Sequence, residues 1–360
     1  MKIIICGLSI TSSWGNGHAT TYRALARALH ARGHDVVFFE RDLDWYAGNR
    51  DMPEPPFCKV HLYEHWQDVL ALLRRELAES DVAMVGSFCP DAFSAITEVL
   101  DSNAAVKAFY DIDTPITVAK LLAGDNEYLR REQIPGFDLY FSFTGGPMMG
   151  QLETEFGARR VVPLYCSFDP DRYRSSAAHP RYKCDLSYMG TYAPDRQAKL
   201  NQFFAGSAER MPEKSFLLAG PQYPSDLIWP KNVRRIVHLE PKFHPAFYCS
   251  SRFTLNLTRQ QMVEAGYSPS VRLFEAAGCG AAIITDSWPG LETFFQPGEE
   301  ILLAGSTEDV VRYLTEMSAD DAMKIGKHAQ ARVLAEHTAE RRAIQFENAV
   351  AAKPSLTQVA

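Results

Sequence analysis

Short apolar segments alternate with helical patterns along this chain, and the alternation begins again in its second half. In the first half, helices are expected at 20–31, 66–79 and 92–101, between strands at 2–6, 36–40, 82–86, 105–110 and 139–143. In the second half, strands are expected at 186–189, 215–219, 233–239, 253–257 and 281–285. Strands joined through helices form parallel sheets that carry helices on both faces and bind ligands at the carboxyl ends of the strands.

A polar stretch at residues 172–183 separates the two halves, and 360 residues suit two domains better than one core. We expect an N-terminal Rossmann-like acceptor domain at 1–165 and a C-terminal Rossmann-like donor domain at 166–335. Residues 320–350 read as one long helical segment, and 336–360 are expected to hold a helix that crosses back to the N-terminal domain, followed by a frayed tail. Two such domains facing each other would form a cleft, where the chemistry is expected.

Composition narrows the class of protein. The net charge of −7 argues against nucleic acid as the main partner. Seven scattered cysteines without a C-x-x-C pair argue for a reducing compartment and against a structural zinc site. The chain begins with a strand, and no apolar run approaches the roughly 18 to 20 residues that span a bilayer. We therefore expect a cytoplasmic protein without a transmembrane segment; the oligomeric state is open, a homo-oligomer included.

The segment from Ser268 to Asp286 combines a short helix, a Gly-Cys-Gly turn and a buried strand. Arg272 and Glu275 are three residues apart, so both can leave the same face of the helix. A cation and a carboxylate beside a strand end suit a sugar nucleotide, whose diphosphate needs positive charge and whose ribose needs an acceptor. The alternative is a salt bridge between Arg272 and Glu275.

This segment, with Trp288-Pro-Gly-Leu-Glu292 and Pro297-Gly-Glu-Glu300 after it, resembles the donor signature of group 1 glycosyltransferases. The similarity is to the version found in CgeB-like (spore maturation protein-like) proteins. It implies an α/β protein of the GT-B fold and a ribose-binding role for Glu275. The wider group often has a second Glu eight residues earlier, where this chain has Tyr267, so retaining stereochemistry is not implied.

The first strand leads into Gly15-Asn-Gly-His18, a pattern that opens a helix with backbone N–H groups free. His18 at the first helical turn has the ordinary pKa range needed to accept a proton from a hydroxyl near neutral pH. The family resemblance implies the same role, because inverting GT-B enzymes often use a His at the start of the first helix as base. Asn16 and Gly17 are expected to contact acceptor or sugar. A capping or substrate-binding His is the alternative.

Two carboxylates, Asp111 and Asp113, follow the strand at 105–110 and precede Pro115. Either could hold His18 through a ring nitrogen, with Asp113 the first choice and Asp111 the second. An Asp that caps the next helix is one alternative. The D-x-D spelling also occurs in metal-dependent transferases of the GT-A class, but no metal is predicted here.

Further donor contacts are expected at strand ends of the second half, by position and by the resemblance. Gly190 and Arg196 would meet the diphosphate, unless Arg196 pairs with Asp195 instead. His238 and Leu239 lie in the loop expected to cradle the base. Asn256 and Arg259 close another strand. Asp286 is expected to face the sugar, with a turn carboxylate as the alternative.

The leading hypothesis is a glycosyltransferase of the hexosyltransferase class that moves a sugar from a nucleotide sugar, UDP-sugar favoured, to an unidentified acceptor. The nucleotide sugar is a co-substrate, so no cofactor is expected. One alternative is a UDP-sugar epimerase of the same fold, and another is a non-catalytic nucleotide-sugar-binding protein. An NAD-linked oxidoreductase would need a glycine fingerprint after the first strand that this chain lacks.

Overall fold

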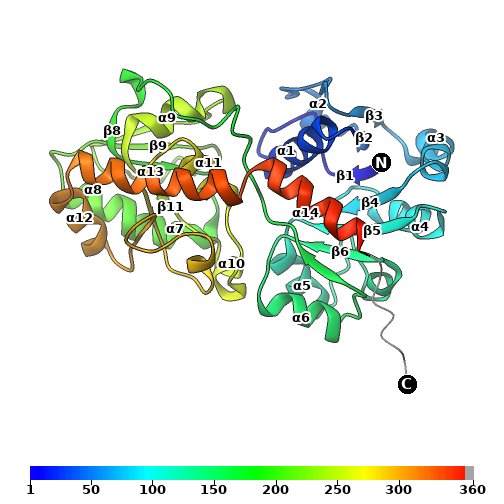
Figure 1. Cartoon of the computed structure of the whole chain (residues 1–360). Helices are drawn as coiled ribbons and strands as arrows, with labels where there is room; N and C mark the ends of the chain where they lie inside the picture. Colours follow the sequence, from blue (N-terminus) through cyan, green and yellow to red (C-terminus); the bar gives the residue numbers. More distant parts are fainter. Residues whose placement is uncertain (353–360) are drawn as a thin grey trace. The chain divides into compact units, whose positions relative to one another are not determined.

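The computed structural model describes residues 1–352, which divide into two compact units. Unit 1 comprises Met1–Cys166 together with the segment that begins at Ala339, and unit 2 comprises Ser167–Thr338 (Figure 1). The first division lies one residue beyond the expected boundary at 165, and the second three residues beyond 335. Of the tail expected to fray, residues 353–360 lie outside the described part of the chain.

Unit 1 is built on a parallel sheet of seven strands in the order β3-β2-β1-β4-β5-β6-β7. Its strands are β1 (Lys2–Gly7), β2 (Asp35–Arg41), β3 (Lys59–Tyr63), β4 (Val82–Gly86), β5 (Val106–Asp111), β6 (Leu139–Ser142) and β7 (Val161–Pro163). Its helices are α1 (Gly17–Ala31), α2 (Asp44–Ala47), α3 (Trp66–Ala78), α4 (Ala92–Asp101), α5 (Thr114–Leu122), α6 (Pro147–Thr154) and α14 (Ala339–Ala351). The strand order reverses between β1 and β4, and such a reversal opens a crevice at the carboxyl ends of the strands.

Unit 2 repeats this plan with six parallel strands in the order β10-β9-β8-β11-β12-β13, which reverses between β8 and β11. Its strands are β8 (Cys184–Met189), β9 (Phe216–Ala219), β10 (Val233–Ile236), β11 (Ser251–Asn256), β12 (Ile283–Thr285) and β13 (Leu302–Leu303). Its helices are α7 (Pro194–Leu200), α8 (Gly206–Arg210), α9 (His244–Ser250), α10 (Gln260–Ala265), α11 (Val271–Gly278), α12 (Thr307–Glu316) and α13 (Ala319–Glu336). Short 3₁₀ or π-helical turns lie at 131–136 in unit 1 and at 180–182, 201–205, 241–243 and 291–293 in unit 2.

The strands that read as apolar runs form the centre of each sheet. Every residue of β4 is buried, and so is every residue of β9, as expected where helices cover both faces of a parallel sheet. The predicted strand at 82–86 and the predicted helix at 92–101 have the same bounds as β4 and α4. Strands β3, β7 and β13 were not predicted, because they are edge strands with fewer buried positions.

The prediction of one long helical segment at 320–350 is wrong in one respect, because the structure has two helices there. Helix α13 ends at Glu336 and α14 begins at Ala339. Thr338 forms a parallel bridge with Phe168, and the ring of His337 stacks on Phe274 at 4.6 Å between centroids. These contacts keep His337 and Thr338 out of the helical conformation. They cannot be predicted from the apolar periodicity of the sequence.

Close packing between α13 and the turn after α11 fixes the position of α11. A Cβ atom on Gly326 of α13 would lie 2.1 Å from the carbonyl oxygen of Gly280, so only glycine fits. A Cβ atom on Gly278, the last residue of α11, would lie 2.5 Å from the ring of Phe168. The glycines at 278 and 326 therefore allow the close packing that holds the helix carrying Arg272 and Glu275.

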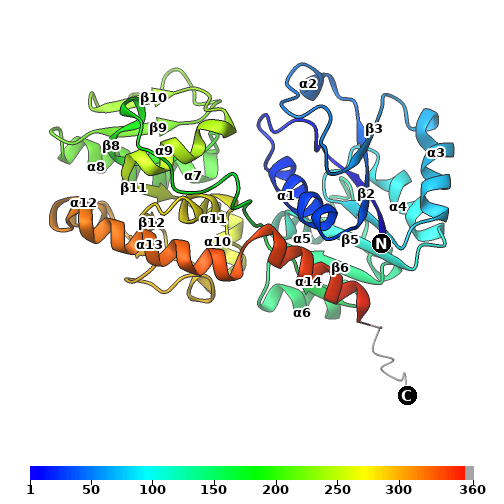
Figure 2. The same ribbon diagram turned by 45° about the horizontal axis from the view of Figure 1, so that its top comes forward.

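Helix α14 lies beside α1 in both views of unit 1 (Figures 1 and 2). Phe346 stacks on Phe141 at 5.2 Å between centroids, and Arg342 Nε donates to the carbonyl of Tyr165 at 3.1 Å. Glu347 accepts two hydrogen bonds of 2.7 Å from the guanidinium of Arg32. Helix α14 is thus an integral part of the first unit.

Replacing Glu347 with Gln tests this docking through its pH dependence. Hydrogen bonds from Arg32, and then from His34, lower the pKa of Glu347 to about 2. A depressed folded-state pKa means that the contribution is present above the unfolded pKa of about 4.5 and is lost as pH falls towards 2. We expect Glu347→Gln to lower the free energy of unfolding by about 1 kcal/mol at pH 7, with no difference left near pH 2.

Urea titrations of both proteins at several pH values measure this difference. Glu64→Gln is the matched control, because Glu64 is exposed on the same unit, and it should leave the midpoint unchanged. A difference between wild type and Glu347→Gln that is as large at pH 2 as at pH 7 would exclude the ionic origin.

Candidate functional site

In unit 1, a histidine and a carboxylate meet at the carboxyl ends of β1 and β5. His18 is the second residue of α1, and its Nε2 lies 2.7 Å from Oδ2 of Asp113. Because a carboxylate only accepts, Nε2 carries the proton of this contact and Nδ1 is left with the lone pair. Nδ1 is buried and has no hydrogen-bond partner. The geometry leaves one ring nitrogen available as a base.

Asp113 stands at the N-cap position of α5, yet its side chain makes no capping hydrogen bond. Its Oδ2 instead accepts from Ser87 Oγ at 3.1 Å, in the loop after β4, as well as facing His18. Of the readings open from the sequence, the structure therefore brings Asp113 to His18 and does not use it as a helix cap. Ser87 was not singled out from the sequence, because a lone serine at a strand end has no distinctive pattern.

Asp111, the last residue of β5, is fully buried and lies away from this pair. Its carboxylate accepts from Tyr140 Oη at 2.5 Å, Thr117 Oγ1 at 2.7 Å and the backbone N–H of Asp113 at 3.1 Å. Burial raises the pKa of Asp111 to about 7. Asp111 forms no hydrogen bond or ion pair with His18 in the described part of the chain, and the hydrogen bond that it accepts from the backbone of Asp113 helps to position that residue.

The loop from β1 to α1 is held by the side chain of Glu40, at the end of β2. Glu40 is fully buried and accepts four hydrogen bonds from this loop: Ser9 Oγ at 2.8 Å, Ile10 N at 2.7 Å, Thr11 N at 3.0 Å and Thr11 Oγ1 at 2.6 Å. One carboxylate thus fixes the segment that leads to His18. Glu40 was not predicted as a functional residue, because the pattern of the sequence around it identifies only a strand.

Asn16 and Gly17 shape the start of α1. Asn16 Oδ1 accepts from the backbone N–H of His18 at 2.9 Å, so the side chain caps the helix, and its Nδ2 donates to the carbonyl of Ser12 at 3.2 Å. Gly17 is exposed and is the first residue of the helix. Asn16 therefore has a structural task next to His18, whatever else it contacts.

In unit 2, Glu275 lies buried on α11 at the end of a chain of polar contacts. The Tyr173 hydroxyl hydrogen-bonds to Glu275 and lies 3.4 Å from Nδ1 of His244, whose Nε2 lies 3.2 Å from the carbonyl oxygen of Leu239. Burial raises the pKa of Glu275, and burial lowers that of His244 to about 4. The predicted residues Leu239 and Glu275 are thus linked through Tyr173 and His244, which the sequence analysis missed.

Arg196 and Arg272 lie close enough in unit 2 for their charges to interact, and the charge of Arg272 also acts on Glu275. Arg196 is buried on α7, its Nη2 donates to the carbonyl of Thr191 at 2.8 Å, and its Nε has no partner. Arg272 Nη1 is likewise buried without a partner, and within the described chain no ion pair joins Arg272 to Glu275. Burial, and the positive charge of Arg272, lower the pKa of Arg196. Unpartnered N–H groups on two cations form a site for an anion.

The alternative ion pairs considered for these residues do not form. Asp195 pairs with Arg259 Nε at 3.3 Å and not with Arg196. The side chain of Arg259, at the start of α10, remains partly exposed. Gly190, just after β8, accepts a hydrogen bond of 3.0 Å at its carbonyl from Tyr223 Oη. His238 is exposed in the loop after β10.

Asn256 and Asp286 are committed to internal contacts. Asn256 accepts from Ser270 Oγ at 2.8 Å and donates to Thr285 Oγ1 at 3.0 Å, which fastens the start of α11 to the strand ends. Asp286 accepts from the backbone N–H and the hydroxyl of Thr258 and pairs with Lys199 at 2.7 Å. Asp286 is 3% exposed, so it takes the position of a buried turn carboxylate.

Two absences bear on the chemistry. Within residues 1–352, no group of three or more His, Cys, Asp or Glu side chains is arranged to hold a metal ion. In the same residues no helix has the length and apolar character needed to cross a bilayer.

Comparison with known proteins adds to this geometry. Residues 196–348 match a protein family described as glycosyl transferase-like. No curated protein matches the sequence. Among solved structures, sucrose-phosphate synthase from Thermosynechococcus elongatus is similar with a TM-score of 0.69 and 14% identity, over 97% of this chain and 98% of that one.

Two further structures are similar to this chain over nearly its whole length. HepE from Anabaena, in complex with UDP and glucose, has a TM-score of 0.68 at 12% identity, over 97% of this chain and 98% of its own. An alpha-glucosyltransferase in complex with UDP-glucose and abasic DNA has a TM-score of 0.71 at 12% identity, over 98% of this chain and all of that one.

The chain has the GT-B fold. The predicted α/β class with two Rossmann-like domains is confirmed. The residues that match the glycosyl transferase-like family include Arg196, Arg272 and Glu275. The CgeB-like version of the family stays a prediction.

Proposed function

We propose that this protein is a glycosyltransferase that moves a sugar from a UDP-sugar to a hydroxyl acceptor. The observation that carries the proposal is the pair of arginines, Arg196 and Arg272, whose buried N–H groups lack partners beside the buried Glu275. A nucleoside diphosphate sugar offers what each group lacks. Its diphosphate supplies anionic oxygens to the arginines, and its ribose supplies hydroxyl groups to the carboxylate.

Support for UDP as the nucleotide comes from the GT-B structures that resemble this chain. HepE is described with UDP and glucose and with UDP-glucose, and the alpha-glucosyltransferase with UDP. In the proposal the loop holding His238 and Leu239 receives the base, with the Leu239 carbonyl oriented by His244. Arg196 and Arg272 then stabilise the charge that develops on the departing UDP, which is expected to be the largest electrostatic contribution.

Unit 1 supplies the base in this proposal. In the reaction, Nε2–H of His18 stays hydrogen-bonded to Asp113. Nδ1 takes the proton of the acceptor hydroxyl while the acceptor oxygen bonds to the anomeric carbon and the bond from that carbon to UDP breaks. Nδ1 is buried in the structure, so the residues that cover it have to move before an acceptor hydroxyl can reach it, while the contact with Asp113 is kept. This route inverts the anomeric centre, because one displacement takes place on the sugar.

The proposed acceptor is a hydroxyl compound other than nucleic acid. One similar structure, the alpha-glucosyltransferase, is described with DNA. This chain carries a net charge of −7, which would repel a polyanion at ordinary ionic strength. A small or oligosaccharide hydroxyl acceptor therefore fits the charge of this protein better.

Glu275→Gln tests the donor site with a near-isosteric change. Loss of the charged acceptor should weaken UDP-sugar binding about 10- to 100-fold, the range expected for hydrogen bonds to a charged group. The variant should melt no lower than wild type, because burial raises the pKa of Glu275 and its charge is therefore costly in the fold. Isothermal titration with UDP-glucose and a thermal melt measure the two effects.

Glu264→Gln is the matched control, since Glu264 is exposed on α10 and accepts from Gln260 at 2.9 Å. Its affinity should equal that of wild type. An unchanged affinity in Glu275→Gln would remove the ribose role from Glu275.

Incubation of the native protein with UDP-sugars separates the proposed function from its alternatives. Release of UDP, by transfer to an added acceptor or slowly to water, supports the transferase. Recovery of an isomerised UDP-sugar without UDP release would indicate the epimerase, and binding without turnover over an acceptor panel would indicate a binding protein. A location in the cytoplasm stays a prediction.

A further inference from the structure

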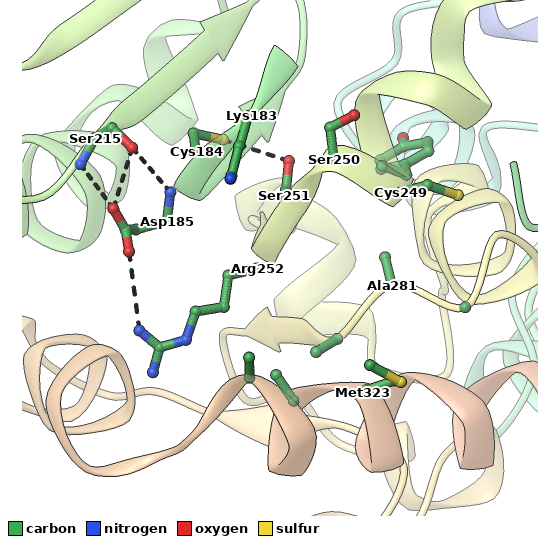
Figure 3. Close-up of a pocket in the computed structure, with 15 residues that line it drawn as sticks. Lys183, Cys184, Asp185, Ser215, Cys249, Ser250, Ser251, Arg252, Ala281 and Met323 are labelled. Atoms are coloured by element: carbon green, nitrogen blue, oxygen red, sulfur yellow. Dashed lines mark hydrogen bonds and ion pairs between the residues drawn. The ribbon is translucent and has the colours of Figure 1, made fainter. Parts of the chain in front are cut away.

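A cavity of about 440 Å³ lies in unit 2 at the amino ends of the strands (Figure 3). It is lined by the first residues of β8 and β11 and by the first turns of α13, including Cys184, Ser251 and Met323. These are the amino ends of the strands, whereas Arg196 and Asn256 follow the carboxyl ends. The cavity therefore lies at the opposite ends of the strands from Arg196, although Tyr248, which lines it, also interacts electrostatically with Glu275.

Cys249 lines this cavity from the last turn of α9, where Figure 3 shows it on the same side as Ala281. Its side chain is partly exposed, and Sγ accepts a hydrogen bond from the backbone N–H of Ser176 at 3.3 Å. The Cys249 thiol also donates a hydrogen bond to the carbonyl oxygen of Cys279 at 3.4 Å. A small solute that enters the cavity can therefore reach this sulfur.

A second thiol touches the first. Cys279 follows α11 directly and is buried, and its thiol hydrogen-bonds to the sulfur of Cys249. That hydrogen bond lowers the pKa of Cys249 to about 6, and it raises the pKa of Cys279. The two cysteines thus differ: Cys249 is an accessible thiol with a lowered pKa, and Cys279 is a buried thiol in contact with it.

We propose that Cys249 and Cys279 form a dithiol site that hydrogen peroxide oxidises to an intramolecular disulfide. The inference rests on the contact between the two thiols, on the backbone donor from Ser176 and on the opening of Cys249 to the cavity. Accessible thiolates beside a second cysteine are the usual sites of reversible peroxide oxidation. It does not depend on the function proposed above.

The reaction balances in two steps. The Cys249 thiolate attacks one peroxide oxygen, the O–O bond breaks, and the sulfur becomes a sulfenic acid while the departing hydroxide is protonated to water. The Cys279 sulfur then attacks Cys249, forms the S–S bond and displaces hydroxide, which takes the proton of the Cys279 thiol and leaves as a second water. Two thiols are oxidised and one peroxide is reduced.

Cys184 is the nearest competitor, because it lines the same cavity. It is buried, its thiol donates to Ser251 Oγ at 3.4 Å, and burial raises its pKa to about 11. A protonated thiol is a poor nucleophile, so Cys184 should be spared.

The test uses the full-length protein, reduced, freed of reductant and treated with a small excess of hydrogen peroxide. Peptide mapping without reduction should show Cys249 joined to Cys279, and the seven free thiols should fall by two. Cys249→Ser should abolish the cross-link. Cys279→Ser should instead leave a sulfenic acid on Cys249 that dimedone traps, and Cys184→Ser should form the cross-link as wild type does.

The pH dependence of iodoacetamide labelling at Cys249 gives a second measurement that needs no oxidation. The midpoint should lie near pH 6 in wild type and move towards the ordinary value of about 8.5 in Cys279→Ser, since the partner thiol is the main cause of the low pKa. Thermal melts establish that both serine variants are folded. A Cys249 that labels with an ordinary midpoint in wild type, or a cross-link from Cys249 to Cys184, would overturn the assignment.

Discussion

Replacing His18 with alanine is expected to lower the rate of sugar transfer about 10²- to 10⁴-fold, the usual contribution of a positioned general base. The ring of His18 pairs with Asp113 at 2.7 Å, and its second nitrogen has no hydrogen-bond partner. The affinity for UDP-sugar should not change, because the proposed donor contacts all lie in unit 2. Release of UDP in the presence of an accepted hydroxyl compound measures the rate, and titration measures the affinity.

His30→Ala is the control for this experiment, since His30 is exposed at the other end of α1. It should transfer sugar at the wild-type rate. Asp113→Asn should fall between the two, because an amide can still orient the ring but stabilises its protonated form less well. Near-normal turnover in His18→Ala would remove the base from the mechanism and favour a route that retains the anomeric configuration.

Arg272→Met carries the second large expectation. It removes a charge that would contact the diphosphate, and a hydrogen bond to a charged group contributes about 1.5 to 3 kcal/mol, so affinity for UDP should fall about 10- to 100-fold. The loss should be larger for UDP than for uridine, which lacks the diphosphate. Titration of both ligands into wild type and variant separates charge recognition from a general distortion of the site.

Stability serves as the internal check on this variant. Arg272 Nη1 is buried without a partner in the described structure, so removal of the charge should not lower the melting temperature. Arg312→Met is the matched control, because Arg312 lies exposed on α12 of the same unit and pairs with Asp309 at 2.9 Å. If Arg272→Met bound UDP and uridine with unchanged affinity, the anion site would have to be placed elsewhere.

Much of the fold can be predicted from the sequence because both sheets are parallel and buried. Their central strands are uninterrupted apolar runs such as Val82–Gly86, and these runs stand out against helices with mixed composition. Edge strands carry weaker patterns, and β3 has only one buried residue. The break at residues 337–338 escaped prediction because it depends on contacts with Phe168 and Phe274, more than 60 residues away along the chain.

The candidate site follows the same division. His18, Asp113, Arg196 and Glu275 could be placed from their positions at strand ends, since parallel strands bring those ends to one edge. Their partners could not. Tyr173 reaches Glu275 from a loop and His244 reaches Tyr173 from α9, and neither belongs to a recognisable motif. Whether a carboxylate is free or occupied, as for Asp286 with Lys199, is likewise decided by tertiary contacts.

The docking of α14 on α1 has a consequence for how the chain is made. Domains generally fold in order of their synthesis, the amino-terminal one first. Here the first unit lacks helix α14 until residues 339–351 leave the ribosome, so the aromatic ring of Phe141 has no Phe346 to cover it while the 172 residues of unit 2, 167–338, are translated. Nascent chains stalled before residue 339 should therefore be markedly more sensitive to protease than the released protein, even though the entire seven-stranded sheet has already been synthesised.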